Sequence, residues 1–303
     1  MPPTNTAPIH SAPPPRETQN MRAIGLMALG FFSFAACDIQ SKVLTETLNP
    51  FQIVWFRQSG LVLGILLILA VKGLHILRSK NPVLQISRGV TAVASACCFT
   101  IAITYVPLAD AVAVSFIAPF MVTILGALVL REKVGIRRWV AVSIGFVGML
   151  IVIRPGAGVF HPAIFLVVAA ASFFSLRQIL SRWLSGADPV ITTVAYTALT
   201  MTAILSVALP FVWVPIPDYQ TVALLFGLAA TAGLGEVLVI RALDIGEAVV
   251  LAPLHYSLIL WATFYGFVVY SDLPDSWTFL GCGIIMASGL YTLHRERKAA
   301  KRK

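Results

Sequence analysis

Residues 110–130 read DAVAVSFIAPFMVTILGALVL, and the aspartate at the start is the only charged residue in the run. About 20 helical residues, at about 1.5 Å each, cross the roughly 30 Å hydrocarbon core of a bilayer. The run is long enough to cross in one pass, with Pro119 near its middle. It therefore predicts a transmembrane helix with an internal bend.

The composition of the whole chain supports this interpretation. Of 303 residues, 58% are hydrophobic and 12% are charged, and the mean hydropathy is +0.87. Soluble domains have about 45–50% apolar and about 25% charged residues. The composition excludes a soluble globular domain, a disordered chain, a collagen and a small disulfide scaffold. It predicts a multi-pass membrane protein with short loops.

Apolar runs of the required length recur along the chain, and they predict an all-α membrane protein of ten transmembrane helices. The predicted spans are 22–44, 50–71, 83–104, 110–130, 137–154, 161–183, 189–209, 219–241, 247–270 and 276–294. Residues 1–20 are rich in proline and predict a disordered tail, and residues 295–303 form a basic tail.

Lysine and arginine lie mainly in alternate connections, which sets the orientation by the positive-inside rule. With the N-terminus inside, the cytoplasmic side holds most of the 22 basic residues, whereas the opposite side holds Lys42 and Arg154. Both termini are thus predicted to be cytoplasmic, in an inner (plasma) membrane. The net charge of +9 follows this pattern. The expected macromolecular partner is therefore the lipid bilayer, and no nucleic acid.

An internal repeat divides the chain into two five-helix halves, 22–155 and 161–294. Ser41-Lys42-Val43-Leu44 matches Ser181-Arg182-Trp183-Leu184, and Ala109-Asp110-Ala111-Val112 matches Gly246-Glu247-Ala248-Val249. A proline follows each of the latter motifs, at Pro119 and Pro253. An odd number of crossings inverts the second copy in the membrane. Inverted repeats are typical of secondary transporters that work by alternating access.

The stretch from Tyr105 through Pro119 to Leu130-Arg-Glu-Lys-Val resembles the drug/metabolite transporter superfamily, as does the ending Arg154-Pro-Gly. It is similar to the ten-helix EamA-type members, and within them to the YddG-type aromatic amino-acid exporters. The resemblance implies a central cavity lined by the predicted helices 22–44, 83–104, 110–130, 161–183, 219–241 and 247–270. It also implies export of aromatic and other bulky amino acids.

Two carboxylates lie inside predicted spans, where an ionised group is costly. Asp38 shares a helix face with Phe31 and Phe34, which predicts a cavity wall with an ammonium or proton site. The alternative is an ion pair with Lys42, four residues on. Glu236 follows a run of small residues and predicts a gate or proton-sensitive switch, or else a salt bridge with Arg241.

Arg57, Arg88 and Arg177 also lie within spans, and a packing role is the favoured interpretation for each. Arg177 is the best candidate of the three to meet a substrate carboxylate. Pro119 and Pro253 are candidate hinges, since proline interrupts the helical hydrogen bonds. The full set of cavity candidates is Phe31, Phe34, Asp38, Phe99, Ser115, Phe173, Arg177, Glu236, His255 and Tyr256.

No catalytic motif and no nucleotide-binding loop is present in the sequence, so the chain is predicted not to be an enzyme. The four cysteines lie in apolar runs without metal-ligand spacing, and neither a metal nor a cofactor is expected. The leading hypothesis is a gradient-driven exporter of bulky amino acids. One alternative is transport of a vitamin, nucleoside or cationic drug, with or without proton coupling, and an intramembrane enzyme or scaffold is a remote one. The oligomeric state is left open, and a monomer fits the sequence.

Overall fold

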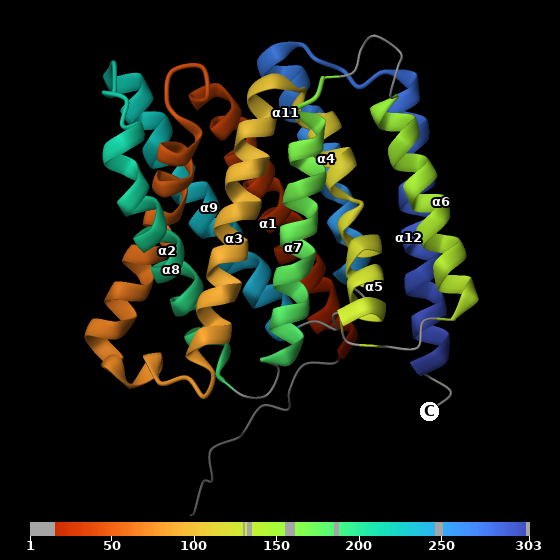
Figure 1. The fold of residues 1–303 in the computed structure, drawn as a ribbon, viewed down its shortest axis with the longest axis horizontal. Coiled ribbons are helices and arrows are strands. Elements are labelled where there is room, and N and C mark those ends of the chain that lie inside the picture. The colour runs from red at the N-terminus through yellow and green to blue at the C-terminus, as the bar shows by residue number, and fades with distance from the viewer. Residues whose placement is uncertain are drawn as a thin grey trace, which may run out of the picture.

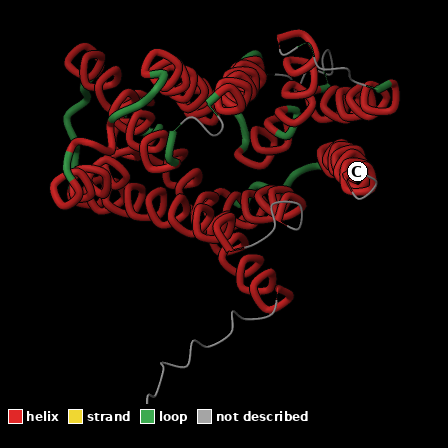
Figure 2. Tube along the Cα trace, turned by 90° about the horizontal axis from the view of Figure 1, so that it is seen from below, coloured by secondary structure: helices red, strands yellow, loops and turns green. Residues whose placement is uncertain are grey.

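The computed structural model describes residues 16–129, 131, 135–154, 161–184, 188–245 and 251–300. Helices and short connections make up this part of the chain, and it contains no strand (Figure 2). The protein is thus all-helical over the described ranges, as predicted.

The helices lie roughly parallel, and consecutive long helices run in alternate directions (Figure 1). We call the end of the bundle where α1 begins the lower end, and the end where α1 stops the upper end. The start of α1 and the end of α12 both lie at the lower end (Figure 1). The elements are α1 Arg16–Leu44, α2 Pro50–Lys72, η1 Leu74–Leu77, α3 Pro82–Tyr105, α4 Leu108–Ser115, α5 Ala118–Val129, α6 Ile136–Ile153, α7 Ile164–Trp183, α8 Val190–Val212, α9 Tyr219–Ile245, η2 Ala252–Tyr256, α11 Ser257–Tyr270 and α12 Ser276–Ala300.

Within the described residues, seven segments are long and apolar enough to cross a membrane. They are Met21–Leu44, Pro50–Lys72, Pro82–Tyr105, Leu108–Val129, Ile164–Trp183, Val190–Val212 and Tyr219–Ile245. The other three predicted spans hold α6, the pair η2 and α11, and α12, whose apolar parts are shorter. Seven spans are therefore confirmed by length and composition, and the remaining three stay predictions.

Both ends of the chain depart from the predicted tails. α1 already begins at Arg16, inside the segment predicted as disordered, and α12 continues to Ala300, through most of the predicted basic tail. Residues 1–15 and 301–303 lie outside the described residues. Helix formation thus extends past the apolar stretches at both ends.

Two helices are broken at the predicted prolines. α4 stops at Ser115, Phe116 and Ile117 form a turn, and Pro119 is the second residue of α5. Proline lacks an N–H and is tolerated in the first turn of a helix, where that N–H has no intrahelical partner. Pro253 lies likewise in the 3-10 turn η2, just before α11. Each proline therefore begins a new helical segment rather than bending a continuous helix.

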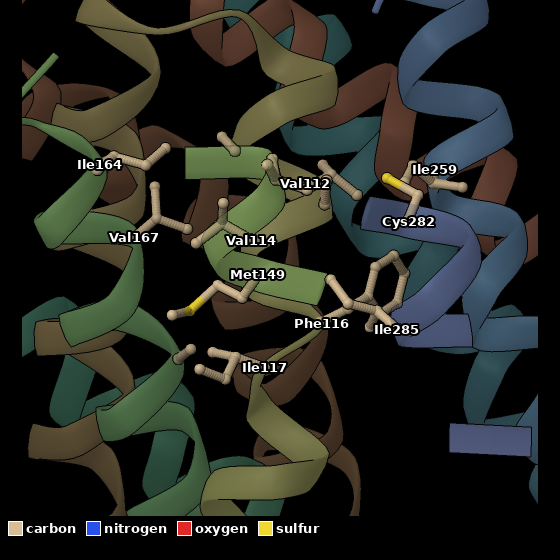
Figure 3. Close-up of a cluster of buried hydrophobic side chains, with 14 of the residues drawn as sticks. Val112, Val114, Phe116, Ile117, Met149, Ile164, Val167, Ile259, Cys282 and Ile285 are labelled. Atoms are coloured by element: carbon tan, nitrogen blue, oxygen red, sulfur yellow. The ribbon is translucent and has the colours of Figure 1, made fainter. Parts of the chain in front are cut away.

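The largest apolar cluster surrounds α4 and its break. Val112 and Val114 of α4 and Phe116 in the turn meet side chains of four neighbouring helices (Figure 3). These neighbours come from α6, α7, α11 and α12, and include Met149, Val167, Ile259, Cys282 and Ile285. Alanines on α4, such as Ala111 and Ala113, are fully buried, which allows close approach of the helices around it.

The helix pairings repeat when each helix of the first half is exchanged for its counterpart in the second. The counterparts are α1 and α7, α2 and α8, α3 and α9, α4–α5 and η2–α11, and α6 and α12. α1 packs along α9, and α3 packs along α7; α2 packs on α9, and α3 packs on α8. α6 packs on α12 and α2 on α8, so these counterparts contact each other. Counterparts run in opposite directions, as α1 and α7 show in Figure 1.

At the lower end, Asp188 connects the two halves. Its carboxylate accepts hydrogen bonds from the Ser79 hydroxyl, the Lys80 backbone N–H at 2.9 Å and the Gln85 amide at 2.9 Å. These donors, led by Ser79, lower the pKa of the Asp188 carboxyl because they stabilise its charged form. The loop before α8 is thereby tied to the start of α3.

Glycines set the spacing between α6 and α12. A Cβ added at Gly281 would lie 2.5 Å from Val152 Cγ2 and 2.6 Å from the Gly148 carbonyl oxygen. By contrast, nothing lies within 4 Å of a Cβ added at Gly283, on the same helix. Only one of the two glycines is therefore required for the close contact.

We expect Gly281→Ala to lower the free energy of unfolding by about 1–3 kcal/mol, since the backbones of α6 and α12 must move apart. Gly283→Ala, the matched control, should leave it unchanged or raise it by about 0.5–1 kcal/mol through better helix propensity. Denaturant unfolding of the purified protein in detergent measures both. Equal effects of the two substitutions would contradict the proposed contact.

Candidate functional site

A cluster of charged side chains lies within the helix bundle, and we call it the charged centre: Asp38, Arg57, Arg88, Arg177 and Glu236. Arg57 Nη1 of α2 lies 2.8 Å from Asp38 Oδ1 of α1, and both side chains are largely buried, with exposed fractions of 24% and 15%. An ion pair at this depth needs such a contact, because either charge alone among apolar side chains is costly. The predicted alternative, a pair between Asp38 and Lys42, is not formed.

Glu236 of α9 is the second carboxylate of the charged centre. It interacts electrostatically with the guanidinium groups of Arg57, Arg88 and Arg177. Among the described residues it makes no ion pair within 4.0 Å, with Arg241 or with any other cation. Glu236 thus lies within electrostatic range of three positive charges without a salt bridge to any of them in the described part of the chain.

Arg88 of α3 is held by hydroxyl groups of two other helices. Its Nε donates to Ser181 Oγ of α7 at 2.7 Å, and its Nη1 donates to Thr197 Oγ1 of α8. These bonds orient the guanidinium group without neutralising its charge. The positive charge of Arg88 therefore remains available to the centre.

Arg177 of α7 has the fewest polar contacts of the three arginines. Its guanidinium carbon lies 4.9 Å from the ring centroid of Phe174, an arrangement in which the cation is attracted to the ring face. Its buried Nε has no hydrogen-bond partner among the described residues. A cavity of about 320 Å³ is lined by Val122, Gln178, Ser181 and Arg182, of which Gln178 directly follows Arg177 in the sequence. The Nε of Arg177 is thus a donor that no described residue uses.

Aromatic side chains of α1 continue the charged centre along the bundle. The ring centroid of Phe31 lies 4.7 Å from that of His255 in η2. Phe34 packs against α9, since a Cβ added at Gly235 would lie 2.9 Å from its Cδ1. The face predicted from Phe31, Phe34 and Asp38 therefore meets η2, α9 and α2 in turn.

Four other predicted residues do not join the charged centre. Phe173 is 37% exposed, and its neighbour Phe174 takes the position against Arg177. Ser115 donates to the Val112 carbonyl of its own helix at 2.7 Å. Phe99 packs on the edge of the large apolar cluster. Tyr256 is discussed with the helix breaks below.

The two helix breaks contact each other. The ring centroid of Phe116, in the turn between α4 and α5, lies 5.2 Å from that of Tyr256, at the end of η2. Tyr256 is 6% exposed, and its hydroxyl oxygen would lie 1.6 Å from a Cβ added at Gly289 of α12. Tyr256 therefore joins the broken helices to α12 rather than facing the charged centre.

Polar contacts connect four elements at the upper end. Lys42 Nζ donates to the Val106 carbonyl at 2.6 Å and lies 5.3 Å from the ring centroid of Tyr270. The Tyr270 hydroxyl donates to Glu46 Oε1 at 2.8 Å. Thr278 donates to Asp110 at 3.1 Å. These contacts join α1, the α3–α4 turn, α11 and α12, and we call them the upper-end cluster.

Sequence reasoning missed parts of this arrangement. The sequence favours snorkelling or pairing that fixes helix packing for Arg57 and Arg88, but it does not predict their partners, Asp38 for Arg57 and two hydroxyl groups for Arg88. Their position inside apolar spans was the available signal, but the partner helices were unknown from the sequence. The described residues contain no group of three or more His, Cys, Asp or Glu side chains suited to a metal ion.

Comparison with known proteins shows the class of protein. Residues 21–154 match the model of the EamA-like transporter family, so the first half of the chain is similar to that family. The chain is a multi-pass membrane transporter. It is not an enzyme. A chain from a solved crystal structure has the same fold, with a TM-score of 0.61 at 16% identity over 93% of this chain and 99% of that one.

Named relatives transport several metabolites. The S-adenosylmethionine uptake transporter of Rickettsia felis is 28% identical over 93% of this chain and 96% of the relative. The riboflavin transporter of Vibrio cholerae is 33% identical over 65% of this chain and 66% of its own length. The pseudopaline exporter CntI of Pseudomonas aeruginosa is 27% identical over 90% and 96%. These relatives do not support the narrower similarity to YddG-type exporters or the export of aromatic amino acids.

A double-mutant cycle tests the Asp38–Arg57 pair. We expect Asp38→Asn and Arg57→Gln each to lower the free energy of unfolding by about 2 kcal/mol or more, since each leaves a charge without its partner. Together they should cost less than their sum, with a coupling energy of about 1–3 kcal/mol. Unfolding in detergent provides the measurement.

The control cycle combines Asp38→Asn with Lys42→Met. Lys42 contacts Val106 and Tyr270 instead of Asp38, so the coupling energy should stay below about 0.5 kcal/mol. A larger coupling to Lys42 than to Arg57 would show that Asp38 pairs within its own helix.

Proposed function

We propose that the protein is a secondary transporter of zwitterionic, nucleoside-bearing metabolites of the S-adenosylmethionine type, working by alternating access. Support comes from the similarity to S-adenosylmethionine uptake transporters, which covers 93% of this chain. This proposal corresponds to the alternative of another metabolite, and it replaces the amino-acid exporter favoured by the sequence alone.

The observation that carries the proposal is the Glu236 carboxylate, which interacts electrostatically with three guanidinium groups and, among the described residues, forms an ion pair with none of them. S-adenosylmethionine carries a carboxylate, an ammonium group and a sulfonium cation. In our proposal its carboxylate binds Arg177, whose buried Nε has no partner, and its ammonium group approaches Glu236. Charge-assisted hydrogen bonds of this kind are about twice as strong as neutral ones.

Aromatic groups next to the charged centre suit the rest of such a ligand. The exposed His255 ring packs against the buried Phe31 ring, and the Phe174 ring lies beside Arg177. In our proposal the purine stacks on these aromatic groups. A mostly apolar wall with a few fixed polar groups is the usual form of a small-molecule site. The combination favours a ligand with one charged head and one flat ring.

The proposed transport cycle rests on two inverted repeats, 22–155 and 161–294, with ten spans and both termini cytoplasmic. The reciprocal helix pairings and the shared lower position of both chain ends support this arrangement. Inverted repeats exchange conformations around a central site, which is how such proteins open to alternate sides. The paired breaks at Pro119 and Pro253 are the proposed hinges.

Transport by the purified protein in liposomes tests the substrate class. We expect saturable uptake of labelled S-adenosylmethionine above empty vesicles, competed by unlabelled S-adenosylmethionine. Labelled phenylalanine should give no saturable flux, and riboflavin should compete weakly because it lacks the amino-acid head. Vesicles loaded with labelled S-adenosylmethionine measure the flux in the export direction. Flux of riboflavin without flux of S-adenosylmethionine would contradict the proposal.

Substitution of Glu236 tests the charged centre. We expect Glu236→Gln to lower the initial transport rate at low substrate at least about tenfold, since losing one partner of a buried charge contact costs about 2 kcal/mol or more.

The matched control is Phe226→Ala, because Phe226 lies on the same helix and is 73% exposed. It should transport at the wild-type rate. An equal loss of rate in Phe226→Ala and Glu236→Gln would contradict the role of the Glu236 carboxylate, while the substrate assignment is tested separately by the flux measurements.

A further inference from the structure

A second cavity lies at the lower end, away from the charged centre. Its volume is about 770 Å³, and it lies between α2, η1, α8 and α9. None of its lining residues belongs to the charged centre, and α2, α8 and α9 lie on the opposite side of the bundle from α6 and α12 (Figure 1). The residues used here, which we call the lower basic pocket, are Ile68, Lys72, His75, Arg78, Val237 and Arg241.

Positive charge is concentrated in the lower basic pocket. Lys72 ends α2, Arg78 follows η1 and Arg241 lies near the end of α9, so three separate elements bring cations to one space. Within the described part of the chain, none of the three forms an ion pair within 4.0 Å. Asp244 is the one acidic residue of the lining. The pocket is therefore suited to an anion.

Apolar side chains form the deeper wall. Ile68 precedes Lys72 by one helical turn, and Val237 precedes Arg241 by one turn, so both lie closer to the middle of the bundle than the cations do. Cations at the mouth and aliphatic side chains above them match the order of groups in a phospholipid, with the phosphate outside and the acyl chains inside. A free phosphate ion has no apolar group that could bury the aliphatic side chains of this wall.

The 3-10 helix η1, which forms one wall of the pocket, is held in place by hydrogen bonds from α8. The Thr192 hydroxyl donates to the Ile76 carbonyl at 2.8 Å, and the Tyr196 hydroxyl donates to the Leu77 carbonyl at 3.0 Å. Both acceptors belong to η1, so the segment that carries His75 and precedes Arg78 is fixed between α2 and α8. Binding therefore needs little ordering of the backbone.

We propose that the lower basic pocket binds the phosphate of an anionic phospholipid from the cytoplasmic leaflet. Arg78 and Arg241 hold the phosphate oxygens through their forked N–H groups, and Lys72 adds a third charge. One acyl chain lies along Ile68 and Val237. Basic pockets between helices on the cytoplasmic side recognise anionic headgroups in this way. The lipid then joins α2 and η1 of one half to α9 of the other.

Lipid binding to the full-length protein in a neutral detergent tests this proposal. The probes are dioctanoyl phosphatidylglycerol, dioctanoyl phosphatidylcholine and inorganic phosphate, each titrated while retained lipid is counted by native mass spectrometry and thermal stability is followed. We expect phosphatidylglycerol to bind and to raise the unfolding temperature, since a ligand of the folded state stabilises it. Phosphatidylcholine and inorganic phosphate should raise it much less.

Variants separate the pocket from general surface charge. Arg241→Gln and Arg78→Gln should each weaken phosphatidylglycerol binding about fivefold, which corresponds to about 1 kcal/mol per basic residue near a headgroup. Arg131→Gln is the matched control, because Arg131 is an exposed arginine between α5 and α6, outside the pocket. It should bind phosphatidylglycerol as the wild type does.

Three results would overturn the proposal. Equal binding of phosphatidylglycerol and phosphatidylcholine would remove the role of the anionic headgroup. An equal shift with inorganic phosphate would indicate a site for a free anion. An equal loss in Arg131→Gln would indicate unspecific surface charge. Should Arg241→Gln unfold without lipid, Arg78→Gln decides, since Arg78 is exposed and lies outside the helices.

Discussion

The cost of an ionised side chain among apolar groups determines how the interior of this transporter is built. An arginine or aspartate inside a span needs a partner, a hydroxyl cage or a water-filled space. Arg57 has an oppositely charged partner in Asp38. Arg88 is surrounded by the hydroxyl groups of Ser181 and Thr197. Among the described residues, Glu236 and Arg177 have neither an ion-pair partner nor a complete set of hydrogen bonds. The groups with incomplete contacts are the ones best suited to bind a charged substrate.

Charge and packing depend on the same helices. α9 crosses α1 at Gly235, where only a glycine admits the Phe34 ring, and the next residue is Glu236. A larger side chain at that crossing would move the carboxylate away from the arginines of α2, α3 and α7. The run of small residues before Glu236 allows this close approach of α9 to α1. The position of the charged group therefore follows from the packing of its neighbours.

The sequence predicted the helical fold well and the partners of the charged groups poorly. The length of an apolar run gives the length of the helix, so the ranges of α2 and α3 and the end of α1 followed from hydrophobicity alone. The charge pair did not, because Asp38 has Lys42 one turn away in sequence, whereas Arg57 belongs to another helix. Similarly, Phe173 and Phe174 are both apolar and adjacent, and only the rotation of α7 decides which ring meets Arg177. The local pattern of hydrophobic residues therefore predicts each helix, whereas the arrangement of the site depends on contacts between helices.

The two ends of the bundle differ in a way that fits one state of the proposed cycle. At the upper end, the upper-end cluster and the ion pair between Arg154 and Asp275 join helices of both halves. At the lower end, described residues line two cavities, and one of them borders Ser181, which holds Arg88. Opening the upper end requires that Lys42 leave the Val106 carbonyl and that Tyr270 release Glu46. Because Tyr270 ends the helix that follows the break at Pro253, and Val106 directly precedes the helix broken before Pro119, movement at the paired breaks acts on both contacts at once.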